Sequence, residues 1–263
     1  MLLKAKHAVI YGASGAVGSV IARTFAREGA HVHLTGRNAA ALNTLAREIV
    51  GTGGTAETAI VDALDEGAVE DHMSALVKRY RSIDVSFNCI GIAQPGIQGI
   101  PLRELSADSF TLPVTTYAHA HFITAKAAAR RMVEQGSGVI MMHTPEPARL
   151  GAPLVGGMGP AWAALESLCR SLSAECAQHG VRAVCLRTTG LPETATIDVV
   201  FDLHAKAYGI TRQQFLGMME GMTHRKRSTT LEELANVASF IASDQAAAMT
   251  GTVANLTGGV TID

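Results

Sequence analysis

The sequence YGASGAVG, at residues 11–18, decides the fold of this chain. It follows a short apolar run and opens an amphipathic helical pattern over residues 16–28. Because glycine recurs every third residue, Gly12 allows a tight turn, Gly15 lets backbone N–H groups approach a pyrophosphate, and Gly18 lets the helix pack closely on a sheet. The helix N-terminus adds free N–H donors and partial positive charge. This strand–turn–helix context predicts a site that holds a dinucleotide.

Short apolar runs alternate with longer amphipathic stretches along the rest of the chain. The apolar runs predict strands at 7–11, 30–34, 58–61, 83–88, 138–142, 182–186 and 252–256. The amphipathic stretches predict helices at 16–28, 38–50, 65–80, 117–135, 160–178 and 231–242. This alternation implies a parallel sheet with right-handed crossovers. We therefore predict an α/β fold over residues 1–263, a single Rossmann-type domain whose doubly wound, seven-stranded parallel sheet has helices on both faces.

The composition restricts the class of the protein and its partners. The 263 residues are 48% hydrophobic and only 17% charged, and the formal net charge is −1. A chain near neutrality has no long-range attraction to nucleic acid or to an anionic membrane, so we exclude both as main partners. The N-terminus has no signal-peptide core, and no apolar run approaches the roughly 20 residues of a membrane helix. We expect a cytoplasmic protein.

The cysteines and histidines show no spacing typical of a zinc site, so we predict no metal. The four cysteines form no Cys-x-x-Cys pair, and we interpret them as reduced, mostly buried thiols. His31 and His33 occupy alternate positions of one predicted strand, and we interpret both as structural.

Residues 188–230 interrupt the α/β alternation. A long insertion in such a chain is usually functional and often forms a lid. Met218, Met219 and Met222 within it would suit the lining of an apolar site, although a surface loop would explain them equally well. We predict that the segment covers the substrate.

The end of the second predicted strand indicates which cofactor binds. An NAD-binding chain usually places an acidic residue there to bind the ribose 2′-hydroxyl. Residues 34–38 read LTGRN and contain no acid. Gly36 leaves room, and Arg37 can form a charge-assisted hydrogen bond to a 2′-phosphate, worth about 1.5–3 kcal/mol. The sequence predicts NADP(H), although Arg37 could instead be a surface cation near the next helix.

Several motifs together resemble those of the short-chain dehydrogenase/reductase family along essentially the whole chain. They are the glycine loop, VDA at 61–63, NCIG at 88–91, FIASD at 240–244, TG at 250–251 and GG at 258–259. The resemblance implies that Asp62 reads the adenine amino group and that Asn88 steadies the sheet beside the cofactor. The predicted cofactor-binding residues are therefore Gly12, Ser14, Gly15, Val17, Gly18, Arg37, Asp62, Ala63, Asn88 and Gly91.

The resemblance breaks at the catalytic residues. The family uses a Tyr with a Lys four residues later, a Ser that polarises the substrate, and an Asn on the preceding helix. The tyrosines here lie at positions 11, 80, 117 and 208, and none has Lys four residues on. Alignment places Met158 at the Tyr position, Trp162 at the Lys position and Tyr117 at the Asn position. Thr144 matches the Ser position, or Pro145 does if the register shifts by one.

We first consider an NADP(H)-dependent oxidoreductase that transfers hydride to or from a small organic molecule with a non-standard proton donor. Thr144 would orient the substrate, and Tyr117 or His143 would supply the proton, with His121 and Glu146 as further candidates. Met158 and Trp162 would reshape an apolar pocket, unless they reflect drift in a site that lost its chemistry.

Two other hypotheses fit the same residues. One is a non-redox enzyme, such as a cyclase, isomerase or dehydratase, on the same scaffold. The other is a non-catalytic NADP(H)-binding subunit or sensor. The helices at 117–135 and 160–178 resemble the family's usual dimer surfaces, so we expect a homodimer or homotetramer.

Overall fold

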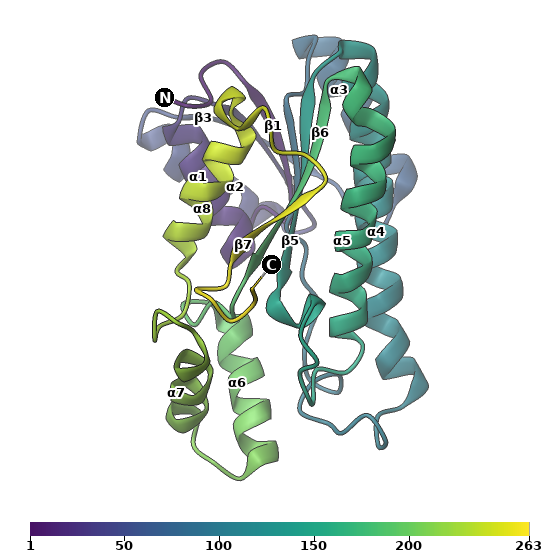
Figure 1. Ribbon diagram of the computed structural model, residues 1–263. Coiled ribbons are helices and arrows are strands. Elements are labelled where there is room, and N and C mark those ends of the chain that lie inside the picture. Colours follow the sequence, from purple (N-terminus) through teal and green to yellow (C-terminus); the bar gives the residue numbers. More distant parts are fainter. Residues whose placement is uncertain (263) are drawn as a thin grey trace.

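The computed structural model describes residues 1–262, which form one seven-stranded parallel sheet with strand order β3-β2-β1-β4-β5-β6-β7 (Figure 1). The strands are β1 (His7–Tyr11), β2 (His31–Gly36), β3 (Thr55–Ile60), β4 (Val85–Asn88), β5 (Gly138–Pro145), β6 (Val181–Thr188) and β7 (Thr252–Leu256). The helices are α1 (Ala16–Arg27), α2 (Ala39–Gly51), α3 (Glu66–Tyr80), α4 (Ala107–Gln135), α5 (Met158–Cys176), α6 (Ala195–Tyr208), α7 (Arg212–Met222) and α8 (Leu231–Ala242). The predicted doubly wound parallel sheet is confirmed.

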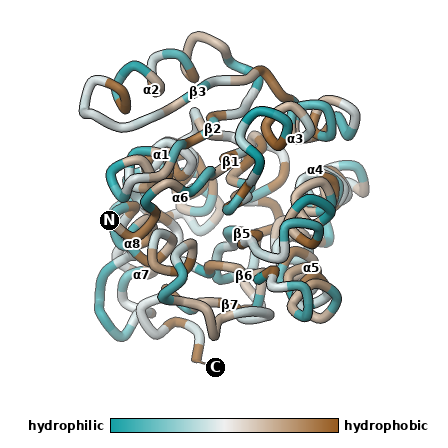
Figure 2. Tube along the Cα trace, turned by 90° about the horizontal axis from the view of Figure 1, so that it is seen from above, coloured by the Kyte–Doolittle hydropathy of each residue, from teal (hydrophilic) through white to brown (hydrophobic). Residues whose placement is uncertain are grey.

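Helices cover both faces of the sheet and form two separate cores, as the view in Figure 2 shows. One core packs α3, α4 and α5 against the sheet, and the other packs α1, α2 and α8 against its opposite face. The helices α6 and α7 lie beyond the sheet and hold a small cluster around Phe201 and Phe215 (Figure 1). The crossovers bring the loops after β1, β4 and β5 to one edge of the sheet. Within residues 1–262, no helix is both long and apolar enough to cross a membrane.

The structure corrects the bounds of several predicted elements. The edge strand β3 begins at Thr55 instead of residue 58, because half of its residues are exposed, none is buried, and they give little apolar signal. Helix α4 begins at Ala107 instead of residue 117 and continues through Pro113, a residue that would normally indicate a break. The segment 188–230 is largely helical, since it contains α6 and α7.

The glycine loop has the geometry that its sequence predicts. Gly12 adopts a positive φ of 69°, which favours glycine. A Cβ atom added to Gly18 would lie 2.4 Å from the carbonyl oxygen of Gly12, so only glycine lets α1 begin this close to the turn. The first turn of α1 therefore presents its N–H groups at the carboxyl end of β1.

Candidate cofactor and substrate site

A cavity of about 910 Å³ opens beside the glycine loop. Its walls come from the loop after β1, the start of α2 and the segments that follow β3 and β4. Among the predicted cofactor residues, those that line it are Gly12, Ser14, Gly15, Arg37, Asp62, Ala63 and Gly91. Val17 and Asn88 line the adjoining cavity, while Gly18 supports the loop by its close approach to Gly12. Seven of the ten predicted residues thus line one cavity beside the glycine turn, as expected of a dinucleotide site.

Arg37 lies at the outer end of this cavity with its side chain 74% exposed. Its nearest acidic partner is Asp62, whose carboxylate oxygen lies 3.9 Å from the guanidinium. Such an exposed, loosely held ion pair contributes little to stability. Arg37 is therefore free to turn toward an anionic group at this end of the cavity.

Asn88 holds the end of β4 against α4. Its amide donates hydrogen bonds to the Thr124 hydroxyl at 3.0 Å and to the carbonyl of Ala120 at 3.3 Å, and its Oδ1 accepts from the Ile90 backbone N–H at 3.0 Å. This buried network fixes the loop that carries Gly91 beside the cofactor cavity.

A second cavity of about 180 Å³ continues from the glycine loop toward α5. Tyr117, His143, Pro145, Met158 and Trp162 line it together with Val17. The alignment positions of the family's Asn, Tyr and Lys therefore converge on one space, although they carry Tyr117, Met158 and Trp162. Their chemical roles stay predictions.

Thr144 does not face this cavity, which corrects its predicted role in orienting the substrate. It is fully buried, donates a hydrogen bond to Glu166 at 3.0 Å and lies 3.4 Å from the Cys185 sulfur. Neighbouring residues of a strand point to opposite faces, so His143 and Pro145 point toward the cavity while Thr144 points into the core under α5. Pro145 therefore occupies the position where the family's Ser would act, and it has no hydroxyl.

The two predicted proton donors, Tyr117 and His143, have pKa values far from neutral pH. Burial raises the pKa of Tyr117 to about 12, despite hydrogen bonds to its hydroxyl from the Ile92 backbone and the Trp162 indole. Burial, followed by the charge of His121, lowers the pKa of His143 to about 4. His143 is therefore neutral at pH 7, and its Nε2 lies 2.9 Å from the Thr188 hydroxyl.

Tyr117, Trp162 and His121 form one aromatic group at the back of the cavity. The rings of Tyr117 and Trp162 meet edge to face with centroids 6.5 Å apart. His121 lies one turn after Tyr117 on the same helix face, with ring centroids 5.9 Å apart, as their spacing predicts. Its Nδ1 lies 3.0 Å from the Tyr117 carbonyl oxygen, and the residue is buried away from the cavity.

A third cavity, of about 330 Å³, adjoins the second and lies between the β5–α5 loop and the predicted lid. Its apolar wall includes the side chains of Val200, Phe201, Phe215, Met218, Met219 and Met222. The polar groups in this wall are few, and Oε1 of Gln98 accepts a hydrogen bond from Nε2 of His204 at 3.1 Å. The sequence did not indicate Gln98 or His204, because they meet only when α6 folds over the loop after β4.

Glu146 is the acidic side chain of this third cavity. It is 5% exposed, and its Oε2 has no hydrogen-bond partner among residues 1–262. Burial raises the pKa of Glu146 to about 7, against a partial opposing effect of its own backbone N–H. A carboxyl with this pKa exchanges a proton readily at neutral pH.

Comparison with known proteins points the same way as the geometry. A protein-family model described as enoyl-(acyl carrier protein) reductase matches residues 12–261. The chain is 27% identical to the gluconate 5-dehydrogenase of Gluconobacter oxydans, over 99% of this chain and 96% of that protein. It is 31% identical to the L-rhamnose 1-dehydrogenase (NAD(P)(+)) of Azotobacter vinelandii, over 100% and 99%. It also resembles the solved gluconate 5-dehydrogenase of Burkholderia cenocepacia in complex with NADP and tartrate, with a TM-score of 0.85, 25% identity, and coverage of 98% and 96%.

Proposed function

The chain belongs to the short-chain dehydrogenase/reductase family, and we propose that it is an NADP(H)-dependent oxidoreductase in which Glu146 replaces the family's Tyr as proton donor. The single observation that carries the proposal is the buried, hydrogen-bond-deficient Glu146 carboxyl in an apolar cavity beside the family's catalytic positions. Tyr117 and His143 were the donors expected from the sequence. They fit less well, because their pKa values of about 12 and about 4 lie far from neutral pH.

The residues around the first cavity fit a bound NADP(H). The glycine turn would hold the pyrophosphate on the backbone N–H groups of α1, and Arg37 would pair with the 2′-phosphate. The cofactor supplies hydride transfer at its nicotinamide ring when bound. The solved relative that contains NADP supports this choice, and so does the absence of an acid at residues 34–38.

In the direction of reduction, this chain must hold the substrate, exclude water and deliver one proton. Glu146 would donate its carboxyl proton to the substrate oxygen or nitrogen as the hydride adds to the neighbouring carbon. Met158 and Trp162 would form an apolar wall of the second cavity, where the family has a Tyr and a Lys. Without ionisable groups in this wall, the local dielectric constant is lower. The electrostatic interaction between the Glu146 carboxyl and the reacting atoms is then stronger.

The substrate we propose is a small organic molecule with an apolar body. The third cavity is walled by aromatic and methionine side chains from α6 and α7, which suit an apolar group and can adapt to its shape. The segment 188–230 would act as the lid that its position predicts. An imine or an enone would be favoured as the reacting group, because each accepts hydride at a carbon atom and then takes up one proton, which Glu146 would supply.

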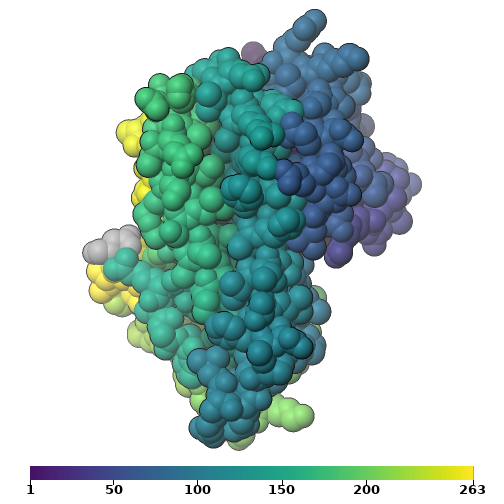
Figure 3. Space-filling view, turned by 90° about the vertical axis from the view of Figure 1, so that its right-hand side faces the viewer, coloured from purple at the N-terminus to yellow at the C-terminus, as the bar shows by residue number. Residues whose placement is uncertain are grey.

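The assembly that we propose is a homodimer or homotetramer formed through the outer faces of α4 and α5, the side of the molecule in Figure 3. Assembly and a cytoplasmic location both stay predictions.

The test of the proposed function is to mix purified protein with NADPH and a panel of apolar imines, enones and ketones, and to follow the absorbance of the reduced nicotinamide. NADPH oxidation matched by product formation supports the proposal. Product without NADPH oxidation would instead support a cyclase, isomerase or dehydratase. Tight NADPH binding with no product across the panel would support a non-catalytic subunit or sensor.

We expect Arg37→Ala to raise the dissociation constant of NADPH about 10- to 100-fold, which corresponds to the loss of one charge-assisted hydrogen bond. The dissociation constant of NADH should change little, because NADH has no 2′-phosphate. Isothermal titration with both cofactors measures the effect, and Arg47→Ala on α2, the helix that follows Arg37, provides the control. The argument for NADP(H) would fail if Arg37→Ala weakened the binding of NADPH and NADH equally. It would also fail if the unmodified protein bound NADH more tightly than NADPH.

A further inference from the structure

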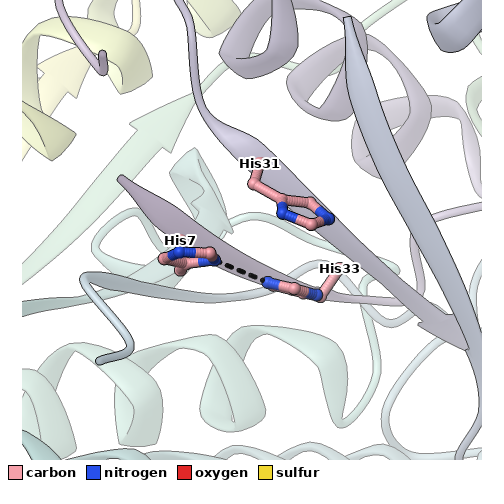
Figure 4. A group of neighbouring side chains, drawn as sticks. All are labelled: His7, His31 and His33. Atoms are coloured by element: carbon pink, nitrogen blue, oxygen red, sulfur yellow. Dashed lines mark hydrogen bonds between the residues drawn. The ribbon is translucent and has the colours of Figure 1, made fainter. Parts of the chain in front are cut away.

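Three histidines meet at the amino ends of β1 and β2, at the far edge of the sheet from the cofactor loops (Figure 4). The parallel register pairs His7 with His31 and Val9 with His33, so all three imidazoles project from the same face of the sheet. Their ring centroids lie 4.5–5.4 Å apart. One ligand nitrogen from each histidine lies within 4.8 Å of the other two.

The hydrogen bonding of this group is incomplete. His7 Nδ1 and His33 Nε2 lie 3.1 Å apart and share one proton between them. His33 is 2% exposed, and its Nδ1 has no hydrogen-bond partner among residues 1–262; the same holds for Nε2 of His31. Buried polar nitrogens almost always have partners, so the unpartnered Nε2 of His31 beside the other two imidazoles indicates room for a ligand.

The spacing of the nitrogens suits a tetrahedral metal ion. Imidazole nitrogens bind Zn²⁺ at about 2.0–2.1 Å, which places two nitrogens of a tetrahedral site about 3.3 Å apart. The observed 3.1 Å between His7 and His33 is already close to that separation. Rotation of the His31 side chain, which is 17% exposed, would bring in the third nitrogen.

The Glu57 carboxylate is close enough to serve as a fourth ligand, and the Tyr80 hydroxyl holds that carboxylate in place. Glu57 lies opposite His33 in the register of β2 and β3, and its Oε1 lies 3.7 Å from Nε2 of His31. The Tyr80 hydroxyl donates a 2.5 Å hydrogen bond to the same Oε1, and the Tyr80 ring packs on all three imidazoles. Hydrogen bonds of this kind orient ligands around bound metals.

We propose that His7, His31 and His33 form a binding site for a divalent transition-metal ion such as Zn²⁺, with the Glu57 carboxylate or a water molecule as fourth ligand. The metal would replace the proton shared by His7 and His33. Imidazole ligands favour Zn²⁺, Co²⁺, Ni²⁺ and Cu²⁺ over Mg²⁺ and Ca²⁺. The ion would join β1, β2 and β3 at the end of the sheet away from the active site.

The experiment uses the full chain without a histidine tag, freed of metal with a chelator and titrated with Zn²⁺ by calorimetry. We expect one Zn²⁺ per chain with a micromolar or lower dissociation constant, and a rise in melting temperature on binding. Co²⁺ should give the visible absorption of a tetrahedral site, and Mg²⁺ should give no binding. NADPH affinity should be unchanged by the metal, so failure of the proposed oxidoreductase activity leaves this test intact.

The variants separate this site from adventitious binding. His33→Val and His31→Thr introduce side chains that strands favour, and each should weaken Zn²⁺ binding more than about 10-fold. The exposed His119→Ala on α4 is the control and should leave binding unchanged. His31→Thr removes a half-buried ligand and keeps the test informative if His33→Val fails to fold. Unchanged Zn²⁺ affinity in His31→Thr, or no stoichiometric binding to the unmodified chain, would overturn the proposal.

Discussion

Replacing Glu146 by Gln should lower kcat/KM for substrate reduction by about 10²–10⁴-fold, the contribution of a positioned general acid. The amide keeps the size of the side chain and its burial but cannot release the proton. NADPH affinity should stay the same, because Glu146 lines the third cavity and not the one beside the glycine loop. Steady-state kinetics and cofactor titration on the same preparation measure both quantities.

The pH dependence gives a second measurement of the same carboxyl. The reduction requires protonated Glu146, so kcat/KM of the unmodified protein should fall as pH rises through about 7, and this limb should be absent in Glu146→Gln. Stability responds in the same range. Because folding raises the pKa from 4.5 to about 7, the stabilising effect of this group is full below 4.5 and is lost as pH rises to about 7. The Gln variant should therefore gain stability relative to the unmodified protein over that interval.

The exposed Glu134→Gln on α4 provides the matched control and should change neither the rate nor its pH profile. A Glu146→Gln variant that retains full activity would show that the proton comes from another group, and Tyr117→Phe would then be the next variant to measure.

The altered residues of the site contact one another, which favours a remade active site over random drift. The alignment predicts Tyr117 at the family's Asn position and Trp162 at its Lys position, and the rings of these two residues meet edge to face. The Trp162 indole is a hydrogen-bond donor, and it donates to the Tyr117 hydroxyl. Met158, which the alignment predicts at the family's Tyr position, is 1% exposed. Complementary packing of this kind is expected where the new side chains were selected together.

The fold was readable from the sequence because its signals are local. The glycine loop carries its own turn and helix start, and the central strands are buried on both faces, so they appear as apolar runs. β3 and the first part of α4 were harder to define. The exposed edge strand lacks an apolar run, and Pro113 suggests a break that the surrounding packing overrides.

The site was harder to predict because it depends on contacts between distant segments. A shift of one residue in the alignment of β5 decides whether Thr144 or Pro145 faces the cavity, and such a shift turns every side chain to the other face. The role proposed for Glu146 depends on its burial in the folded chain and on its place in the cavity under α6 and α7. In the proposed metal site, His7 lies 24 positions before His31 in the sequence. The parallel register of β1 and β2 brings His7 next to His31 and His33.

Replacing Glu166 by Leu should lower the free energy of unfolding by about 3–5 kcal/mol, the usual cost of removing one partner from a buried ion pair. The Glu166 and Arg187 side chains are 6% and 3% exposed, and they form two hydrogen bonds, at 2.6 Å and 2.8 Å. Oε1 of Glu166, which accepts the 2.8 Å hydrogen bond from Arg187, also accepts the hydrogen bond from the Thr144 hydroxyl. Leu would remove from the core the Glu166 carboxylate that pairs with the buried Arg187 guanidinium. Urea unfolding should show a lower midpoint with an unchanged m-value.

The double variant Glu166→Leu/Arg187→Met tests the cause of that loss. If the cost comes from the loss of the carboxylate beside the buried guanidinium, removing the guanidinium as well should recover most of the lost stability, since well-packed apolar residues often replace buried ion pairs without penalty. Because Glu166 also holds Thr144 at the end of β5, the single variant should disturb the positions of His143 and Pro145 and weaken substrate turnover. A single variant that loses less than about 1 kcal/mol would contradict the expectation that the buried Glu166–Arg187 pair stabilises the packing of α5 on β6.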